Sequence, residues 1–162
     1  MAKTKITALL HTCNDALHLG RALDSLRPCD EVIIVDHGSS DDTVNVARDH
    51  GARVVQGVKG VNHGAYGQDA SNDWLLCLLP YESLADDLEA SLLEWREQEH
   101  AENQTGFNVG LREQNGEDWK FLPAEMRLVN RKQINWIGDL PPANPNAPSL
   151  QGHIMRIKDE AA

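Results

Sequence analysis

The sequence predicts an α/β fold in which a mostly parallel central sheet carries helices on both faces, with a short mixed or antiparallel part at the C-terminal end. Continuous apolar runs, typical of strands buried on both faces, recur through the first half of the chain. Segments with the helical spacing of apolar residues separate these runs. Because the connections are short, the strands are expected to pair in parallel.

The first strand is predicted at residues 6–11, where Ile, Leu and Ala follow one another without interruption. Asn14 is the expected N-cap of the helix that follows, and Pro28 ends that helix. Residues 31–36 form the clearest strand in the sequence. The turn at residues 37–40 then leads the chain into a second helix.

The second helix is expected to begin at Asp41 or Asp42 and to end at His50, where Gly51 closes it. A third short strand is predicted at residues 53–56. A Gly-rich segment then leads to a fourth strand, expected at residues 74–79.

The remaining part begins with an amphipathic helix, predicted at residues 83–100 from the spacing of its apolar residues. Short strands are then expected at residues 105–112, 126–130 and 133–137. The Pro-rich stretch at 140–148 predicts an irregular loop, and residues 154–157 are expected to return to the sheet as an edge strand.

Length, charge and cysteine content narrow the function classes. A chain of 162 residues encloses one well-buried core, so we expect a single domain. The formal net charge of −10 repels nucleic acid and anionic membranes. No apolar segment approaches the roughly 20 residues of a membrane span. Three cysteines without a CxxC pair favour a reducing compartment, and we expect a cytoplasmic protein.

Polar motifs follow the first two predicted strands. Residues 12–15 read Thr-Cys-Asn-Asp, and residues 35–43 read Val-Asp-His-Gly-Ser-Ser-Asp-Asp-Thr. Open parallel sheets bind ligands beyond the carboxyl ends of their strands, so the two motifs should face one crevice. A second interpretation is that Asp36 and Ser39 only make the turn and cap the following helix.

These motifs resemble the family 2 glycosyltransferases of the GT-A fold, whose VDxGSxDxT signature is similar to residues 35–43. The strong resemblance covers the first third of the chain, and weaker resemblance covers most of the rest. In the later part, Met126–Asn130 followed by Trp136-Ile137-Gly138 resembles the bacterial lipopolysaccharide-core and cell-envelope members. Further matching positions are Gly51-Ala52, Gly60, Asp73-Trp74, Glu82 and Leu84.

The resemblance implies one GT-A-like domain over residues 1–162, with a nucleotide-binding-like half at 1–100 and a shortened acceptor-side half at 101–162. It also implies a nucleotide sugar, such as a UDP-sugar, as the ligand. The carboxylate matching Asp36 would accept a hydrogen bond from the base. The nucleotide-binding residues implied by the resemblance are Thr12, Asn14, Asp36, Gly38 and Ser39. Where relatives often have a basic residue after Gly60, His63 is the candidate to face the diphosphate.

The sequence departs from the family where an acidic Asp-x-Asp triplet normally holds Mg²⁺ or Mn²⁺. Leu79-Pro80-Tyr81 stands there, and these side chains are not ligands for a hard cation. Only Glu82 remains from that neighbourhood. We therefore expect no cofactor and no metal ligand, with Mg²⁺ or Mn²⁺ only if other residues rebuild the site. Glu82 and Asp139, which follows the Trp-x-Gly segment, are the candidates for acid/base help.

One substitute metal site is left open. His11, His37 and His63 each lie near the end of a strand or in the following loop, and with Cys13 they offer ligands suited to zinc. Against this, closed zinc sites show tighter local spacing, and a histidine in such a loop is often an ordinary surface residue.

Three functional interpretations follow. The first is a degenerate family 2 glycosyltransferase-like protein that keeps a nucleotide-sugar-type cleft without the usual metal site. The second is a non-catalytic nucleotide-binding or protein-interaction module with a protein partner. The third is metal-independent transfer from a nucleotide sugar. An unrelated α/β binding domain fits the long match through the second strand less well.

Overall fold

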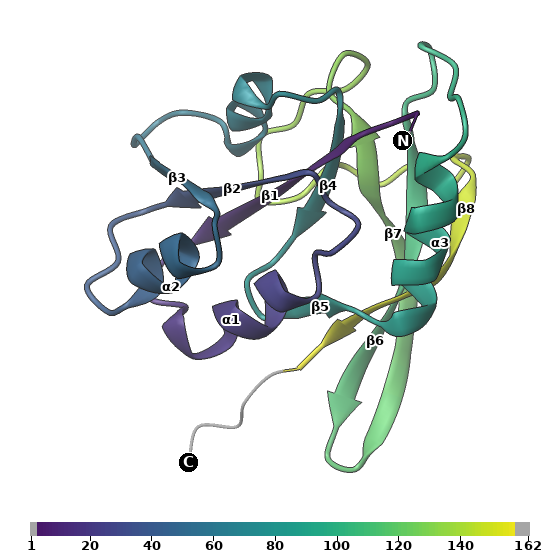
Figure 1. The fold of residues 1–162 in the computed structure, drawn as a ribbon. Helices are drawn as coiled ribbons and strands as arrows, with labels where there is room; N and C mark the ends of the chain where they lie inside the picture. The colour runs from purple at the N-terminus through teal and green to yellow at the C-terminus, as the bar shows by residue number, and fades with distance from the viewer. Residues whose placement is uncertain (1–2, 158–162) are drawn as a thin grey trace.

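The computed structural model describes residues 3–157, which form one eight-stranded sheet in the order β3-β2-β1-β4-β7-β6-β8-β5 (Figure 1). The strands are β1 (Ile6–Thr12), β2 (Glu31–Asp36), β3 (Arg53–Gln56), β4 (Trp74–Leu78), β5 (Glu82–Leu84), β6 (Gly106–Asn115), β7 (Asp118–Asn130) and β8 (Ser149–Arg156). The helices are α1 (Ala16–Asp24), α2 (Thr43–Asp49), α3 (Asp86–Arg96) and the 3-10 helix η1 (His63–Asp69).

The sheet has a parallel part and a mixed part. β1 pairs in parallel with β2 and β4, and β2 pairs in parallel with β3. β7 is antiparallel to β4 and β6, whereas β8 is parallel to β6 and antiparallel to β5. This confirms the predicted α/β fold with a mostly parallel sheet and a mixed C-terminal part. It also places the carboxyl ends of β1 and β2 side by side at one edge.

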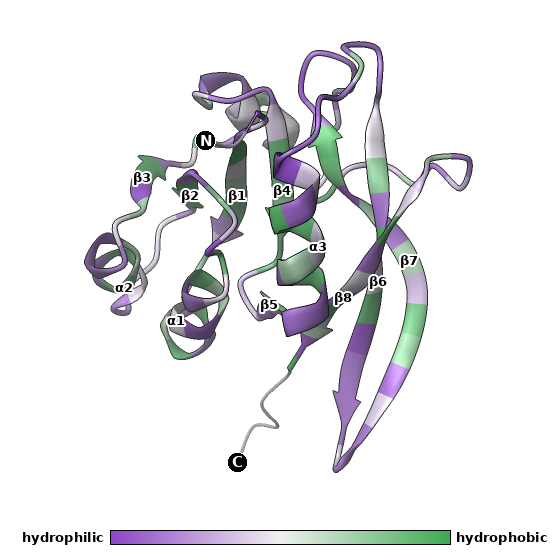
Figure 2. Cartoon of the chain, turned by 45° about the vertical axis from the view of Figure 1, so that its right-hand side comes forward, coloured by the Kyte–Doolittle hydropathy of each residue, from purple (hydrophilic) through white to green (hydrophobic). Residues whose placement is uncertain are grey.

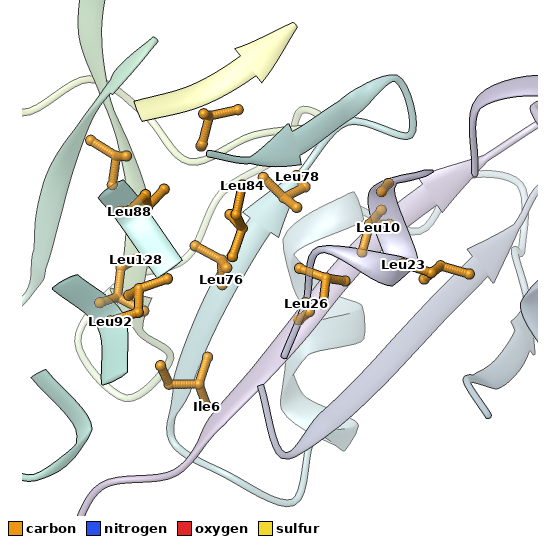
Figure 3. Close-up of a cluster of buried hydrophobic side chains, with 14 of the residues drawn as sticks. Ile6, Leu10, Leu23, Leu26, Leu76, Leu78, Leu84, Leu88, Leu92 and Leu128 are labelled. Atoms are coloured by element: carbon orange, nitrogen blue, oxygen red, sulfur yellow. The ribbon is translucent and has the colours of Figure 1, made fainter. Parts of the chain in front are cut away.

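Side chains along β1 alternate between two apolar cores. Ile6, Ala8 and Leu10 belong to the first core, which α1, α2 and α3 cover with apolar faces (Figure 3). Leu9 belongs to the second core, where Tyr66 of η1 and Trp136 of the loop after β7 pack on the sheet. Figure 2 shows polar residues at the hairpin end of β6, away from the two cores. Both faces are covered as expected, but the second cover is a 3-10 helix and a loop.

The start of α1 differs from the prediction. Asp15, not Asn14, occupies the N-cap position, and Asn14 has a positive φ of 58° that no helix start requires. The helix also ends at Asp24, several residues before Pro28. The physical reason is that Asn14 turns towards the β2–α2 loop, where its side chain accepts hydrogen bonds from backbone N–H groups.

Residues 82–84 form β5 and not the first turn of the helix predicted for 83–100. β5 pairs antiparallel with β8, and α3 covers only Asp86–Arg96. The apolar spacing alone does not separate these states, because Leu84 and Leu88 are buried in the same core in either conformation.

The C-terminal strands also differ from the prediction. β7 is much longer than the expected strand at 126–130, because it forms a hairpin with β6 around Gly116, whose φ is 65° (Figure 1). The predicted strand at 133–137 does not form. β8 is not an edge strand, since it lies between β6 and β5. The predicted loop at 140–148 is irregular as expected. None of the helices in residues 3–157 is both long and apolar enough to cross a membrane.

Candidate functional site

Asp36 lies at the carboxyl end of β2 and ties this strand to its neighbour. Its side chain is buried, and Oδ1 accepts hydrogen bonds from Thr12 Oγ1 at 2.8 Å and from Ser39 Oγ at 2.6 Å. Oδ2 accepts the Ser39 backbone N–H at 2.9 Å. Thr12, Asp36 and Ser39 therefore form one network across the ends of β1 and β2, where the sequence placed them.

Asn14 connects the two motifs through its backbone and its side chain. Its N–H donates to Ser39 Oγ at 2.8 Å, and its Oδ1 accepts the Ser40 N–H at 2.8 Å. The turn between them depends on Gly38, whose φ of 88° suits glycine. The structure thus brings together five of the predicted nucleotide-binding residues.

Asp36 is ionised in this network. Burial alone would raise the pKa of its carboxyl, but hydrogen bonds from Ser39, Thr12 and the Gly38 backbone lower the pKa below its usual value. These donors occupy most of the acceptor positions that a carboxylate offers. Asp36 and Ser39 hence make the turn, but neither caps the following helix, whose N-cap position is Asp42. Contact between Asp36 and a base stays a prediction.

His11 and His37 lie at the same edge of the sheet but on its other side. Each is adjacent in sequence to a member of the Asp36 network, and successive side chains of a strand point to opposite faces. His11 Nδ1 and His37 Nε2 are 2.9 Å apart, which is a hydrogen-bond distance. The two rings are stacked, with centroids 5.2 Å apart.

His63 completes a cluster of three imidazoles. Its ring stacks on His11 with centroids 4.1 Å apart and on His37 with centroids 4.8 Å apart. The Tyr66 ring meets His11 edge-on, at 5.6 Å between centroids. We call His11, His37 and His63 the histidine cluster. The sequence left open whether these side chains meet, and their positions show that they do. Cys13, the fourth candidate ligand, does not belong to the cluster, and its Sγ donates to the His37 carbonyl at 3.6 Å.

Asp139 reaches the cluster from the loop after β7. Its Oδ1 lies 2.6 Å from His63 Nδ1. The backbone supports this approach, because the His63 N–H donates to the Ile137 carbonyl at 3.1 Å. The fold therefore joins a residue predicted for the diphosphate with one predicted for the acceptor side, a pairing that the sequence did not indicate.

His11 and His37 favour the uncharged form. Burial, followed by the proximity of His63 and His37, lowers the pKa of His11 to about 4. Burial and His63 also lower the pKa of His37. A neutral imidazole keeps a lone pair on one ring nitrogen, which it can offer to a proton or to a metal ion.

The segment after β4 has no available carboxylate in the part of the chain that the structure describes. Leu79, Pro80 and Tyr81 carry none, and Glu82 is fully buried. Arg127 binds both oxygens of Glu82, at 2.6 and 2.9 Å, and Arg156 binds Oε2 at 2.9 Å. The role of Glu82 in catalysis stays a prediction, and its contacts favour a structural role.

Arg127 is a residue that sequence reasoning missed. It is fully buried in β7, and burial opposes its charge, but hydrogen bonds and charge from Glu82 and Glu125 raise its pKa. An arginine between Met126 and Leu128, inside an apolar strand, was the available signal. Buried arginines require an anionic partner, and the partner here is Glu82.

Three surface pockets lie away from the Asp36 network. Two of them, of about 390 and 480 Å³, are lined by residues from the amino ends of the parallel strands, including Asp73 and Glu31 respectively. A third, of about 410 Å³, lies between β7 and the Pro-rich loop, where Asn108 and Pro141 line it. The predicted nucleotide-sugar-type cleft is none of these three, and it remains a prediction.

Comparisons with known proteins find glycosyltransferases. No protein-family profile matches the chain. A protein of Rickettsia felis named "Uncharacterized glycosyltransferase" is 37% identical over 91 residues, which cover 52% of this chain and 31% of that protein. A glycosyltransferase of Rickettsia prowazekii, also named uncharacterized, is 35% identical over 91 residues, covering 52% and 30%. The matched region thus spans less than a third of these curated relatives.

Among solved structures, the GT-A type glycosyltransferase TarS of S. aureus superposes on 74% of this chain and 38% of its own, with a TM-score of 0.55 and 16% identity. At this identity the likeness concerns the fold alone.

Proposed function

We propose that this chain, which is glycosyltransferase-like and has a GT-A-like fold, binds a nucleotide sugar at the carboxyl edge of its parallel strands. The observation that carries the proposal is the network of Thr12, Asn14, Asp36 and Ser39. It joins the ends of β1 and β2 at the place where open parallel sheets bind ligands. A UDP-sugar is the ligand class that we expect.

The turn between β2 and α2 is ordered by its own hydrogen bonds, and we expect it to receive the nucleoside. Its polar side chains are held by one another, so their positions are set before a ligand arrives, which lowers the ordering cost of binding. Asp36 is buried beneath the turn, Ser39 is half-buried and Asn14 is exposed. We therefore expect Asp36 to act through the shape of this turn as well as through any contact with the base.

The chemistry after binding differs from that of a metal-dependent transferase. The residues present do not fit Mg²⁺ or Mn²⁺ at positions 79–81, since hard cations take oxygen ligands and Glu82 is locked between two arginines. This observation favours a degenerate site. It also favours the second interpretation of the sequence, a nucleotide-binding or protein-interaction module without catalysis.

Metal-independent transfer from a nucleotide sugar is the third interpretation, and one contact favours it. Asp139 has a largely exposed side chain next to His63, with 2.6 Å between Oδ1 and Nδ1. A carboxylate in this position could accept a proton from an acceptor hydroxyl while His63 faces the leaving diphosphate. Both catalytic roles are proposals.

The surroundings of the cysteines support a reducing, cytoplasmic setting. The three thiols are free, and burial raises the pKa of Cys29 and Cys77 to about 12, so neither is a reactive thiolate.

Thermal unfolding with UDP, UDP-glucose, GDP or dTDP, each with and without Mn²⁺, tests the proposal. A ligand that binds the native state raises the melting temperature by mass action. We expect a rise with UDP or UDP-glucose that does not require Mn²⁺. Release of UDP from UDP-glucose in the same samples separates transfer from binding.

Asp36→Asn is the informative variant, because it keeps the side-chain shape but weakens the turn; we expect it to lose the ligand-induced rise. Asp73→Asn is the matched control, since Asp73 lies at the opposite edge of the sheet and pairs with Arg131. Absence of any rise with all four ligands would reject nucleotide binding and leave the interaction module.

A further inference from the structure

We propose that His11, His37 and His63 bind one transition-metal ion, such as Zn²⁺, and that Asp139 positions His63 for this role. The site lies on the other side of the sheet edge from Asp36 and does not rest on the proposed nucleotide binding. It shares His63 and Asp139 with the metal-independent transfer considered above, but metal binding is measured without a nucleotide, so failure of one idea leaves the other testable.

The spacing of the nitrogen atoms is close to that of metal ligands. One ring nitrogen from each histidine lies within 4.8 Å of the other two. Zinc binds imidazole nitrogen at about 2.0–2.1 Å, so two nitrogens on a tetrahedral ion are separated by roughly 3.4 Å. His11 Nδ1 and His37 Nε2 are 2.9 Å apart, so this pair already has nearly the required separation.

The third ligand requires a modest rearrangement. His11 and His63 are stacked with only 13° between their planes, whereas lone pairs on one ion must converge within the ring planes. Rotation of the rings about χ2, a broad torsion in histidine, allows this convergence. Metal binding thus predicts a change from stacked to converging rings.

The second ring nitrogen of His11 is buried without a partner. His11 Nε2 is inaccessible to solvent and has no hydrogen-bond partner among the residues that the structure describes. Such atoms are rare in folded proteins, and a bound ion or an ordered water often satisfies them. An imidazole binds one ion through one nitrogen, so the ligand atom of His11 is either this Nε2 or the Nδ1 that faces His37, and in the second case Nε2 carries the proton.

Asp139 has the position of a carboxylate that supports a metal-bound histidine. Its Oδ1 is 2.6 Å from His63 Nδ1 but not in line for a hydrogen bond, and rotation of the ring would let Nδ1–H donate to it and leave the Nε2 lone pair for the ion. Pairing of this kind fixes the tautomer and ring orientation of metal ligands. The aspartate also adds a negative charge that partly balances the cation.

Gly57 explains why the His37 ring fits against the others. A Cβ atom at residue 57 would lie 2.3 Å from His37 Nδ1, far inside van der Waals contact. The backbone is held there by a hydrogen bond from Gly57 N–H to the Asp36 carbonyl at 2.7 Å. An alanine at this position would push the imidazole away without removing a ligand.

The ligand set determines which ions suit the site. Three imidazoles favour Zn²⁺, Co²⁺, Ni²⁺ or Cu²⁺, whereas Mg²⁺ and Ca²⁺ prefer oxygen ligands. We expect one Zn²⁺ per chain and no measurable competition from Mg²⁺ at equal concentration.

Isothermal titration of tag-free protein with Zn²⁺, together with the visible absorption of the Co²⁺ form, tests the site. We expect one ion per chain in the wild type and at least a tenfold weaker affinity in His37→Gln and His63→Gln, because each removes one of three ligands. His50→Gln is the matched control. The His50 side chain has nearly the same exposure as that of His63, at 31% against 29%, and it also contacts a carboxylate, Asp24.

Two further variants keep every ligand. Asp139→Asn should weaken Zn²⁺ binding by roughly 10 to 100 times, and Gly57→Ala should weaken it while circular dichroism shows a folded protein. The proposal is overturned if the wild type binds Zn²⁺ no more tightly than His63→Gln. If the histidine variants do not fold, a wild-type Co²⁺ spectrum without nitrogen-ligand bands overturns it equally.

Discussion

Glu82 and Arg127 form a buried ion pair that fixes both oxygens of the carboxylate. Both side chains are fully buried, and Arg127 donates to both oxygens of Glu82. Burial alone would raise the pKa of Glu82, but the hydrogen bonds and charge of Arg127 lower it below its usual value. A carboxylate so held has little freedom to bind a metal ion or to exchange a proton with a substrate.

The substitution Glu82→Gln should strongly destabilise the fold. It leaves the buried Arg127 guanidinium without its main counter-charge, and breaking such a pair from one side typically costs about 3–5 kcal/mol. The free energy of unfolding from urea titration measures the loss.

Glu125→Gln is the control for this prediction. Glu125 also accepts a hydrogen bond from Arg127, at 2.9 Å, but its side chain is 41% exposed. An exposed pair contributes about 0–1 kcal/mol, so a small loss is expected. Equal losses in the two variants would show that Glu82 is not the dominant partner.

Gly152 determines how α3 lies on β8. Its φ is 105°, and an added Cβ would lie 2.5 Å from the backbone N and Cα atoms of Leu88. Leu88 is fully buried in the first core, so a shift of α3 away from β8 would disturb the packing there (Figure 3). Close approach of helix and strand here requires a residue without a side chain.

We therefore expect Gly152→Ala to lower the free energy of unfolding by at least about 2 kcal/mol, from backbone strain together with the clash against α3. Chemical denaturation provides the measurement. Gly138→Ala is the matched control, because nothing lies within 4 Å of its added Cβ and its φ is not positive. Its effect should stay within about 0.5 kcal/mol; a comparable loss at both positions would contradict the packing argument.

Elements that depend on local sequence were predicted well. β2 and β3 have the predicted bounds, because an apolar run between turn residues identifies a strand without reference to its partners. β5 was missed, since it is stabilised by β8, about 70 residues away. The false strand at 133–137 contains apolar residues that pack on the second core from a loop.

The stability of the whole protein is sensitive to acid, because folding lowers the pKa of particular carboxylates. Folding lowers the pKa of Glu82, as described above. It also lowers the pKa of Asp87, because hydrogen bonds from His153 and Leu88 outweigh burial. A group with a lowered folded-state pKa contributes its full stabilisation above its unfolded pKa and loses it as the pH falls through the folded value.

The difference in stability between the wild type and Glu82→Gln should therefore shrink as the pH falls from about 5 towards 3, since the unfolded pKa of glutamate is near 4.3. Urea midpoints at pH 7, 5, 4 and 3 follow this difference. The comparison cancels most of the general effect of the −10 net charge, which both proteins share apart from one unit. A difference that stays constant would show that Arg127 does not hold Glu82 in its ionised form.

The candidate site was partly readable from the chain. The residues 12–15 and 35–43 had to meet, because parallel neighbouring strands end at one edge, and the structure joins them through Asp36 and Asn14. That positions 79–81 carry no carboxylate was also plain from the residue types. Both conclusions use only short-range order and the known pairing geometry of strands.

Contacts between distant segments came only from the fold. Arg127 reaches Glu82 across 45 positions, and Asp139 reaches His63 from a loop whose path no local pattern indicated. Alternation along the strands sends His11 and His37 to the side opposite Thr12 and Asp36. The loop that covers that side is selected by its packing against the second core. The residues of this core come from distant segments, so no short stretch of the sequence contains the information that fixes the loop.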